Sequence, residues 1–548
     1  MKKIFTVIQI VFCVTMAHAQ NPQIQVGEEV KQNKEIYWAD MEHITSEGQT
    51  SFLFLKPYET KGGFLTINLF PKSPSVIAKL DEQSLNIVQA EKFPLEFFGE
   101  KLKVEKVLMI NKKLYAFYSF INKKEDKVQI YRAEVNRKTL KLAEQPVLTL
   151  NLNTPKEKFK EEVFVLKTSN DGSKFYFGYS LVDKQYDIVD LGFRVYDKNF
   201  QTINQWQGSV DESKVISQPE QVEVANDGTV YGLIKQFASK KEYKNGGKYK
   251  KTGLFSGIRS LQWNANYGYQ LAEFRANQPM KIWPIIRQGQ FVNIAKIQPL
   301  NDGVMVGGFY GANNLNRPVG MFVQKYDAKG ELLNEQLHQL PQSFTQPSSP
   351  DTKTKSWLSS KKKLFAPFTM NMSDVVLCKD GSVVFSGERW VRQSMTQTNG
   401  NGQTVTIYYH QFDDIALLKV TPEGNVEQFH KIEKHQQIAD GMTRFGGYNI
   451  KEEDGKLYCF YINTNKKSKV WPKAKRISSH LVTIDEQANK SKNVIFSTDQ
   501  HDIALKSDEV YWTASNELVM LTTQSPRKWK FVKFKPSLKF QSDIGEEE

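Results

Sequence analysis

The chain repeats one pattern of four predicted strands about eight times, and the clearest copy runs from Asn293 to Gln339. Within this copy, Asn301-Asp302-Gly303 separates the first two predicted strands, and Asp327-Ala328-Lys329-Gly330 separates the last two. Such turns between alternating apolar runs are typical of β-hairpins, because glycine accepts the positive φ that tight turns require. An open sheet of this many strands would leave long exposed edges, whereas radial closure does not. The sequence therefore predicts an all-β fold: a single β-propeller of eight four-stranded blades, or seven as the alternative.

The first turn of the repeat recurs along the whole chain, at residues 46–48, 111–113, 170–172, 226–228, 301–303, 379–381, 453–455 and 515–516. A period of roughly 55 to 80 residues is longer than that of a common blade, so several copies must carry insertions. Because each blade buries its faces against its neighbours, one ring can reach this length without a second core.

The repeats resemble the YVTN/NHL-like propeller class, in which an Asp-Gly turn and a Tyr-Asp-x-x-Gly turn punctuate each blade. Tyr326-Asp327 followed by Gly330 carries the second of these turns. The segment with Glu388-Arg389-Trp390, Asn399-Gly400-Asn401-Gly402 and residues 408–420 resembles uncharacterised secreted propeller-type proteins of outer-membrane-bearing bacteria. These resemblances cover nearly all of the mature chain and imply an architecture, but they transfer no activity.

The amino terminus predicts export. Residues 1–19 combine Lys2-Lys3, an apolar run from Ile4 to Met16 and Ala17-His18-Ala19 as a small-x-small cleavage site, which is typical of a signal peptide. The propeller would then occupy residues 20–538, followed by a polar, acidic tail at 539–548. No later apolar stretch is long enough for a membrane helix. We therefore expect a location in the periplasm, at the outer membrane or outside the cell.

Charge suggests acidic partners. Removal of Lys2 and Lys3 lowers the formal net charge from +14 to +12, which favours lipid headgroups, anionic glycans or acidic protein faces. Lysine is also the common solubilising residue of an all-β surface, so the alternative is that the positive charge only keeps the surface soluble. Nucleic acid is not expected for an exported chain.

Cys378 and Cys459 are the two cysteines beyond the signal peptide, in apolar strand contexts of different repeats. We expect buried free thiols. A disulfide is the alternative, and it would need their Cα atoms within roughly 7 Å.

Four long inserts share one predicted face. With the strands of a blade named A to D, antiparallel order places the B–C and D–A links on one rim and the A–B and C–D turns on the other. The inserts at 237–265, 388–411 and 462–479 are B–C links, and 341–369 is a D–A link. Their interleaved basic and aromatic residues suit an anionic polymer or a protein interface, or else form solvated loops. The predicted ligand-binding residues are Tyr243, Lys248, Tyr249, Trp357, Arg389, Trp390, Lys469, Trp471 and Lys473.

Catalytic signals are weak. Phosphate-binding loops, hydrolase elbows and zinc motifs are all missing from the sequence, so no cofactor and no metal is predicted. The best acidic candidates are Glu388, Asp413 and Asp414, which should meet near Arg389 and His410. A glycoside hydrolase needs two carboxyl groups about 5 Å apart, or roughly 6.5 to 9.5 Å apart, depending on its mechanism. The other interpretation is a cluster of ion pairs at the root of a long hairpin.

The leading functional hypothesis is therefore a non-enzymatic binding or scaffold module of the bacterial cell envelope. Its partner would be an envelope protein or an anionic glycan, with peripheral association to an outer-membrane complex. The alternative is a carbohydrate-active enzyme that uses the rim carboxylates.

Ring closure is predicted at the amino terminus. The eighth repeat supplies only three strands, at 509–512, 518–523 and 528–534. Gln23-Ile24-Gln25-Val26 alternates polar and apolar residues like a half-buried strand, yet it precedes the first blade. We expect it to pair beside Lys528–Phe534, which would complete the last blade and remove an exposed edge.

Overall fold

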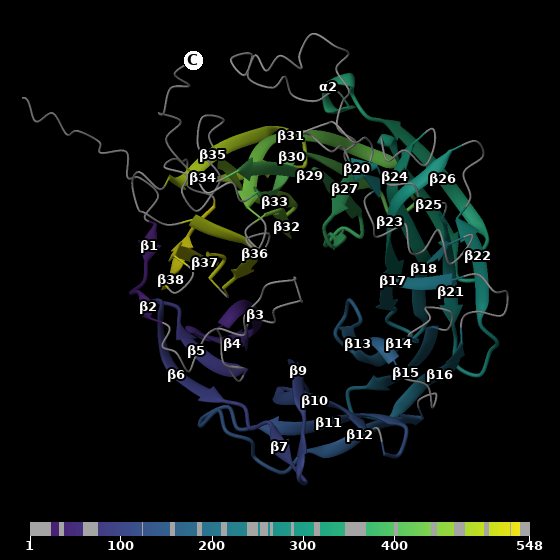
Figure 1. The fold of residues 1–548 in the computed structure, drawn as a ribbon, viewed down its shortest axis with the longest axis vertical. Coiled ribbons are helices and arrows are strands. Elements are labelled where there is room, and N and C mark those ends of the chain that lie inside the picture. The colour runs from purple at the N-terminus through teal and green to yellow at the C-terminus, as the bar shows by residue number, and fades with distance from the viewer. Residues whose placement is uncertain are drawn as a thin grey trace, which may run out of the picture.

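Eight antiparallel sheets stand side by side around a central axis (Figure 1). The computed structural model describes residues 24–31, 38–57, 75–122, 124–153, 159–183, 189–209, 216–237, 250–251, 261–262, 267–285, 290–311, 318–345, 369–398, 404–439, 446–464, 477–497, 504–513, 515–525 and 528–536. Each sheet is one blade, numbered here 1 to 8 along the chain. The predicted β-propeller with eight four-stranded blades is confirmed.

In the first four blades the strands follow chain order, with strand A nearest the central axis and strand D outermost. Their strands are β3 (Trp38–Glu47), β4 (Thr50–Pro57), β5 (Val76–Asp81) and β6 (Asn86–Lys92); β9 (Lys103–Ile110), β10 (Lys113–Asn122), β11 (Lys127–Val135) and β12 (Val147–Asn153); β13 (Phe159–Thr168), β14 (Lys174–Asp183), β15 (Val189–Asp197) and β16 (Thr202–Ser209); and β17 (Ile216–Val224), β18 (Val230–Phe237), β21 (Tyr267–Phe274) and β22 (Lys281–Ile285). Two small hairpins accompany them, β7 (Glu96–Phe97) with β8 (Glu100–Lys101) and β19 (Lys250–Lys251) with β20 (Leu261–Gln262).

The last four blades repeat this order, but blade 6 has a fifth strand and blade 8 takes its outer edge from the amino terminus. Their strands are β23 (Phe291–Leu300), β24 (Gly303–Gly311), β25 (Pro318–Asp327) and β26 (Leu332–Gln339); β27 (Thr369–Met372), β28 (Val376–Leu377), β29 (Val383–Thr398), β30 (Thr404–Val420) and β31 (Val426–Ala439); β32 (Tyr448–Glu453), β33 (Lys456–Thr464), β34 (Ile477–Ile484) and β35 (Lys490–Ser497); and β36 (Ala504–Trp512), β37 (Leu518–Ser525) and β38 (Lys528–Phe534) with β1 (Gln25–Val26) and β2 (Val30–Lys31). A single helical turn, α2 (Gln342–Thr345), follows blade 5.

The core lies between consecutive blades. Every residue of β24 is buried, because this strand is covered on both faces, and a strand in that position reads as a continuous apolar run. A Cβ atom on Gly307 would lie 2.6 Å from the ring of Phe385 in blade 6. Glycine at this position therefore lets the two blades pack closely. Cys378 and Cys459 are both buried, free and part of one apolar cluster between blades 6 and 7, as the first interpretation of the sequence expected.

The amino terminus closes the ring as predicted. Gln25 pairs with Lys533 and Val30 pairs with Trp529, so β1 and β2 lie end to end along β38 at the outer edge of blade 8 (Figure 1). Gly27 lies between them, and its N–H donates to the carbonyl oxygen of Phe531 at 2.9 Å. The segment also touches blade 1, since a Cβ atom on Gly27 would lie 2.7 Å from Leu85.

Ion pairs join the A strands of neighbouring blades. Lys106 of β9 pairs with Glu42 of β3 at 3.0 Å, and Lys167 of β13 pairs with Glu223 of β17 at 2.8 Å. These contacts join blade 1 to blade 2 and blade 3 to blade 4 at their inner edges.

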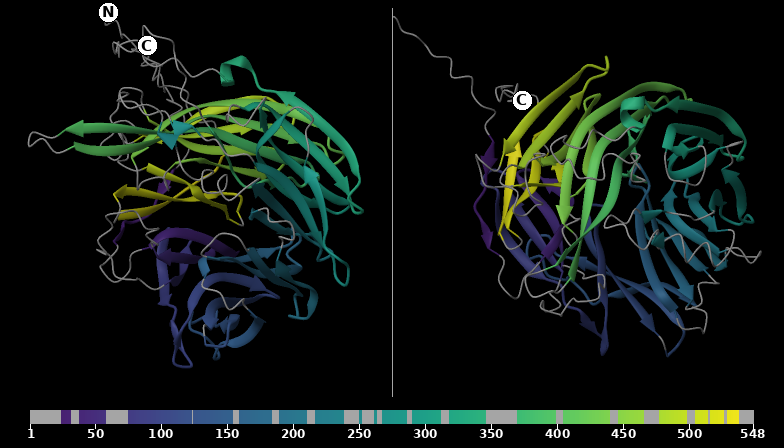
Figure 2. Two further views of the ribbon diagram at one scale, coloured as in Figure 1. Left: turned by 45° about the vertical axis from the view of Figure 1, so that its right-hand side comes forward. Right: turned by 45° about the horizontal axis from the view of Figure 1, so that its top comes forward.

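The insert at 388–411 differs from its prediction as a link. Most of it belongs to the strands themselves, since β29 and β30 have 16 and 17 residues, whereas no described strand outside blade 6 exceeds ten. Its threonine, valine and tyrosine residues favour extended backbone, and their cross-strand pairs continue out to Thr398 and Thr404. We call the part of β29 and β30 beyond Trp390 and Phe412 the blade 6 hairpin. Figure 2 shows it in green, extending beyond the neighbouring blades. In the described part of the chain, no helix is long and apolar enough to span a membrane.

Candidate functional site

Blade 6 brings together the residues that the sequence proposed for catalysis. Glu388, Arg389 and Trp390 lie on β29, and Asp413 and Asp414 lie opposite them on β30. Of the nine predicted ligand-binding residues, only Arg389 and Trp390 belong to the described part of the structure. The other seven lie outside it: Tyr243, Lys248, Tyr249, Trp357, Lys469, Trp471 and Lys473. Of the four inserts predicted to share one face, the structure therefore describes this face only at the blade 6 hairpin.

Two irregularities of the sheet shape this site. The register of β29 against β30 shifts between Glu388 and Trp390, and the register of β30 against β31 shifts between Asp413 and Ile415. Bulges of this kind leave one residue unpaired and redirect neighbouring side chains. Next to these shifts, the side chains of Glu388 and Asp413 lie inside the blade at the root of the hairpin, where each contacts charged partners.

Glu388 is completely buried and paired with Lys434 of β31. The Lys434 ammonium donates to Glu388 Oε2 at 2.5 Å and to the carbonyl oxygen of Gly447 at 2.7 Å, and Asn371 Nδ2 donates to Glu388 Oε1 at 3.0 Å. Neither charged side chain is exposed. Burial raises the pKa of Glu388 above its ordinary value, although Lys434 and Asn371 oppose this shift.

Asp413 holds a second set of partners. Its Oδ2 atom accepts from Arg389 Nη2 at 2.7 Å and from Gln411 Nε2 at 2.8 Å, and its Oδ1 atom lies 2.9 Å from His435 Nδ1. Burial alone would raise the pKa of Asp413, but His435 and Arg389 outweigh it and hold the pKa below its ordinary value. The carboxylate is therefore kept ionised within the sheet.

The cluster also ties blade 6 to blade 7. The backbone N–H of His435 donates to Asn463 Oδ1 at 2.9 Å, and Tyr461 Oη donates to the carbonyl oxygen of Glu433 at 3.1 Å. Lys431 pairs with Asp414 at 3.1 Å nearer the surface. We call Glu388, Arg389, Asp413, Lys434 and His435 the root network.

The root network is closed to solvent on most sides. His435 is its most exposed member, with 31% of its side chain accessible, against 3% or less for the other four. Above it, Trp390 Nε1 donates to His410 Nδ1 at 3.1 Å, and the two rings stack with centroids 5.7 Å apart. The carboxylates thus face cations and amides inside the blade, which fits an anchor for the hairpin better than an acid and base facing a substrate.

Sequence reasoning did not identify Lys434, Asn371 or His435 as partners of these carboxylates. Counting along the hairpin from the turn at Thr421–Gly424 would place His435 opposite Asp413, provided that two register shifts are allowed, one at Lys419–Val420 and one at Asp413–Ile415. The second shift has no clear sequence signal. Within the described residues, no group of three or more histidine, cysteine or acidic side chains could hold a metal ion.

Comparisons with known proteins add only distant similarities. No family model matches the sequence, and no curated protein matches it. Among solved structures, the chain is similar to the polysaccharide lyase Uly1, with 9% identity over 93% of this chain and 99% of that one and a TM-score of 0.38. It is also similar to the β-propeller domain of the Trilobed protease from Pyrococcus furiosus, with 9% identity over 84% and 95% of the two chains and a TM-score of 0.33. Similarities this distant carry no argument about activity.

Proposed function

We propose that this protein is an exported binding or scaffold module, which holds a partner of the bacterial cell envelope through the face that carries the blade 6 hairpin. The partner would be an envelope protein or an anionic glycan, in the periplasm or at the outer membrane. Its repeats would belong to the YVTN/NHL-like class, whose turn pattern they resemble. The single observation that supports this role is the long, continuously paired hairpin built on a buried, paired root.

Rigidity is what makes the hairpin suitable for binding. Loops on a rigid scaffold commonly carry recognition, and a preorganised surface loses less conformational entropy when it binds. The hairpin is paired along its length from Trp390 to Thr398, and the root network fixes its base within blade 6 and against blade 7. The neighbouring inserts, with their predicted basic and aromatic residues, would extend the same surface.

The geometry of the acidic residues favours binding over hydrolysis. A glycoside hydrolase needs one carboxyl group able to give a proton to the leaving group and a second facing the sugar. Both oxygens of Glu388 and both oxygens of Asp413 instead contact donors within the blade. Each acid would have to give up one of these partners before it could act on a substrate.

Shortening the hairpin tests this proposal. Residues 394–408 would be replaced by Asn-Gly, a two-residue turn that joins the register partners Gln393 and Tyr409. We expect the variant to lose capture of the envelope partner that the unaltered chain retains, because the projecting surface is gone. Its melting temperature should change by no more than about 2 °C, because the root network is kept.

Pull-down from solubilised envelopes, followed by calorimetry of both chains, provides the measurement. A variant with Lys198→Ala and Lys329→Ala, two exposed lysines in C–D turns of the opposite rim, tests whether changes on that rim affect capture. Normal capture by the shortened chain would contradict the proposal, as would loss of capture in the control alone.

A further inference from the structure

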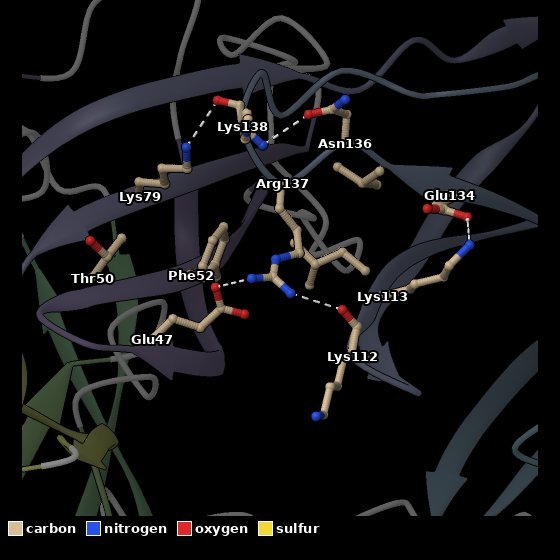
Figure 3. A pocket seen from close by; sticks show the side chains of 12 residues that line it. Glu47, Thr50, Phe52, Lys79, Lys112, Lys113, Glu134, Asn136, Arg137 and Lys138 are labelled. Atoms are coloured by element: carbon tan, nitrogen blue, oxygen red, sulfur yellow. Dashed lines mark hydrogen bonds and ion pairs between the residues drawn. The ribbon is translucent and has the colours of Figure 1, made fainter.

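A hollow of about 630 Å³ lies between blades 1 and 2 (Figure 3). Its walls come from the A–B turns of both blades, the C–D turn of blade 2 and the strands beneath them. These turns form the rim opposite the blade 6 hairpin, so this hollow is separate from the surface in the proposed function. Its volume is within the range of sites that bind small molecules, about 300 to 1,000 Å³.

The wall contributed by blade 2 is fixed in place. Lys79 Nζ of blade 1 donates to the carbonyl oxygen of Lys138 at 2.9 Å, and Gln89 Nε2 donates to the carbonyl oxygen of Thr139 at 2.9 Å. Asn136 Oδ1 accepts the backbone N–H of Lys138 at 2.9 Å. These bonds hold the C–D turn of blade 2 over blade 1, so the hollow is largely preformed.

Positive charge exceeds negative charge around the hollow. Five cationic side chains and two carboxylates line it, a formal excess of three positive charges. The carboxylates are already used: Glu47 pairs with Arg137, and Glu134 pairs with Lys113 at 2.8 Å (Figure 3). The three remaining lysines, Lys79, Lys112 and Lys138, have no ion-pair partner among the described residues.

The surroundings of these three lysines leave their charge available. Lys79 bonds only neutral oxygen atoms, those of Gln89 and the Lys138 backbone, each at 2.9 Å. In the described structure, the ammonium groups of Lys112 and Lys138 have no hydrogen-bond partner, and both residues are exposed at the mouth of the hollow. Arg137 is oriented by its bond to the carbonyl oxygen of Lys112 at 2.9 Å.

We propose that this hollow binds a multiply charged phosphate group, carried by a small phosphorylated molecule or displayed on a membrane surface. A phosphate offers up to two negative charges and several acceptor oxygens, which several ammonium groups can share. A carboxylate offers one charge and two oxygens, so it would leave part of the positive excess uncompensated. The hollow has room for more than one phosphate group, so it could also hold part of the molecule that carries the phosphate.

The direct test is calorimetric titration of the purified chain with inorganic pyrophosphate at low ionic strength, with acetate as the monovalent comparison. The double variant Lys112→Gln and Lys138→Gln removes two of the three uncompensated charges without breaking any described contact. We expect it to bind pyrophosphate about tenfold more weakly or worse, the order expected for losing charge-assisted hydrogen bonds. The matched control is Lys198→Gln with Lys329→Gln, which removes the same charge from the same rim outside the hollow and should leave the affinity within about twofold.

A second arm identifies the source of the phosphate. Flotation with phosphatidylcholine vesicles, with and without phosphatidic acid, shows whether a surface-bound phosphate reaches the hollow. Vesicle binding that pyrophosphate competes away supports a membrane ligand, and pyrophosphate binding without vesicle binding supports a soluble one. The proposal is overturned if the unaltered chain does not bind pyrophosphate, if acetate binds equally well, or if both double variants weaken binding to the same extent.

Discussion

Removal of β1 and β2 is expected to lower the free energy of unfolding by about 3–5 kcal/mol. The two strands supply the missing outer edge of blade 8, and Ile24 and Val30 pack against the core cluster that contains Trp529. Burying an aliphatic side chain contributes about 1.5–3 kcal/mol when it is complete, and both Ile24 and Val30 are partly buried. Denaturant unfolding should compare a chain that begins at Glu35 with one that begins at Gln23, which keeps both strands.

A single substitution gives an independent check on this closure. Gly27→Val would place side-chain atoms against Leu85 of blade 1, where even a Cβ atom would lie at 2.7 Å. It should therefore destabilise the chain in the same direction as the truncation, but by less. Equal stability of the two truncated chains would show that the closing strands do not support the ring.

The second large effect is expected for Lys434→Met, which should lower the free energy of unfolding by about 3–5 kcal/mol at neutral pH. The substitution removes the cation that pairs with Glu388 and leaves a carboxylate with no exposed surface. Breaking a buried pair on one side has this magnitude because the remaining charge is uncompensated. The double variant Glu388→Gln with Lys434→Met should recover most of the loss, because the amide introduced at position 388 is neutral and could still accept a hydrogen bond from Asn371.

The stability of the Lys434→Met variant should depend on pH in a defined direction. Burial raises the pKa of Glu388 in the folded chain above its ordinary value of 4.5, so the folded state binds a proton more readily than the unfolded state. The deficit of Lys434→Met is therefore complete above the folded pKa and shrinks as the pH falls toward 4.5. Chemical denaturation across this range, with the double variant as the reference, isolates Glu388. A deficit that does not change with pH would show that Lys434 acts by packing alone.

The sequence predicted the ring because its turns and strands carry local signals. Asn301-Asp302-Gly303 and Asp327 to Gly330 lie where the structure has the A–B and C–D turns of blade 5, and the positive φ of Gly330 explains why glycine is needed there. Ring closure was predictable for a related reason, since Gln25 and Val26 formed a strand pattern with no place in the first blade.

The candidate site was predictable only in part, because it depends on contacts between distant segments. Proximity of Glu388 to Asp413 and Asp414 follows from the hairpin, and the structure places them on neighbouring strands. Lys434 on β31 reaches Glu388 on β29 across the intervening strand β30, and its burial depends on packing against blade 7, which leaves no periodic signal. The hollow between blades 1 and 2 was missed for the same reason, because Lys79 and Lys138 meet only when two blades are adjacent.

The most direct test of the proposed role places a photo-reactive amino acid at Gln393, on the blade 6 hairpin, or at Lys329, on the opposite rim, in cells that express the protein. Illumination followed by mass spectrometry identifies whatever lies against each position. A binding module that uses the hairpin face predicts one reproducible envelope component cross-linked from Gln393 and none from Lys329. Cross-links from Lys329 alone, or from neither position, would contradict that role.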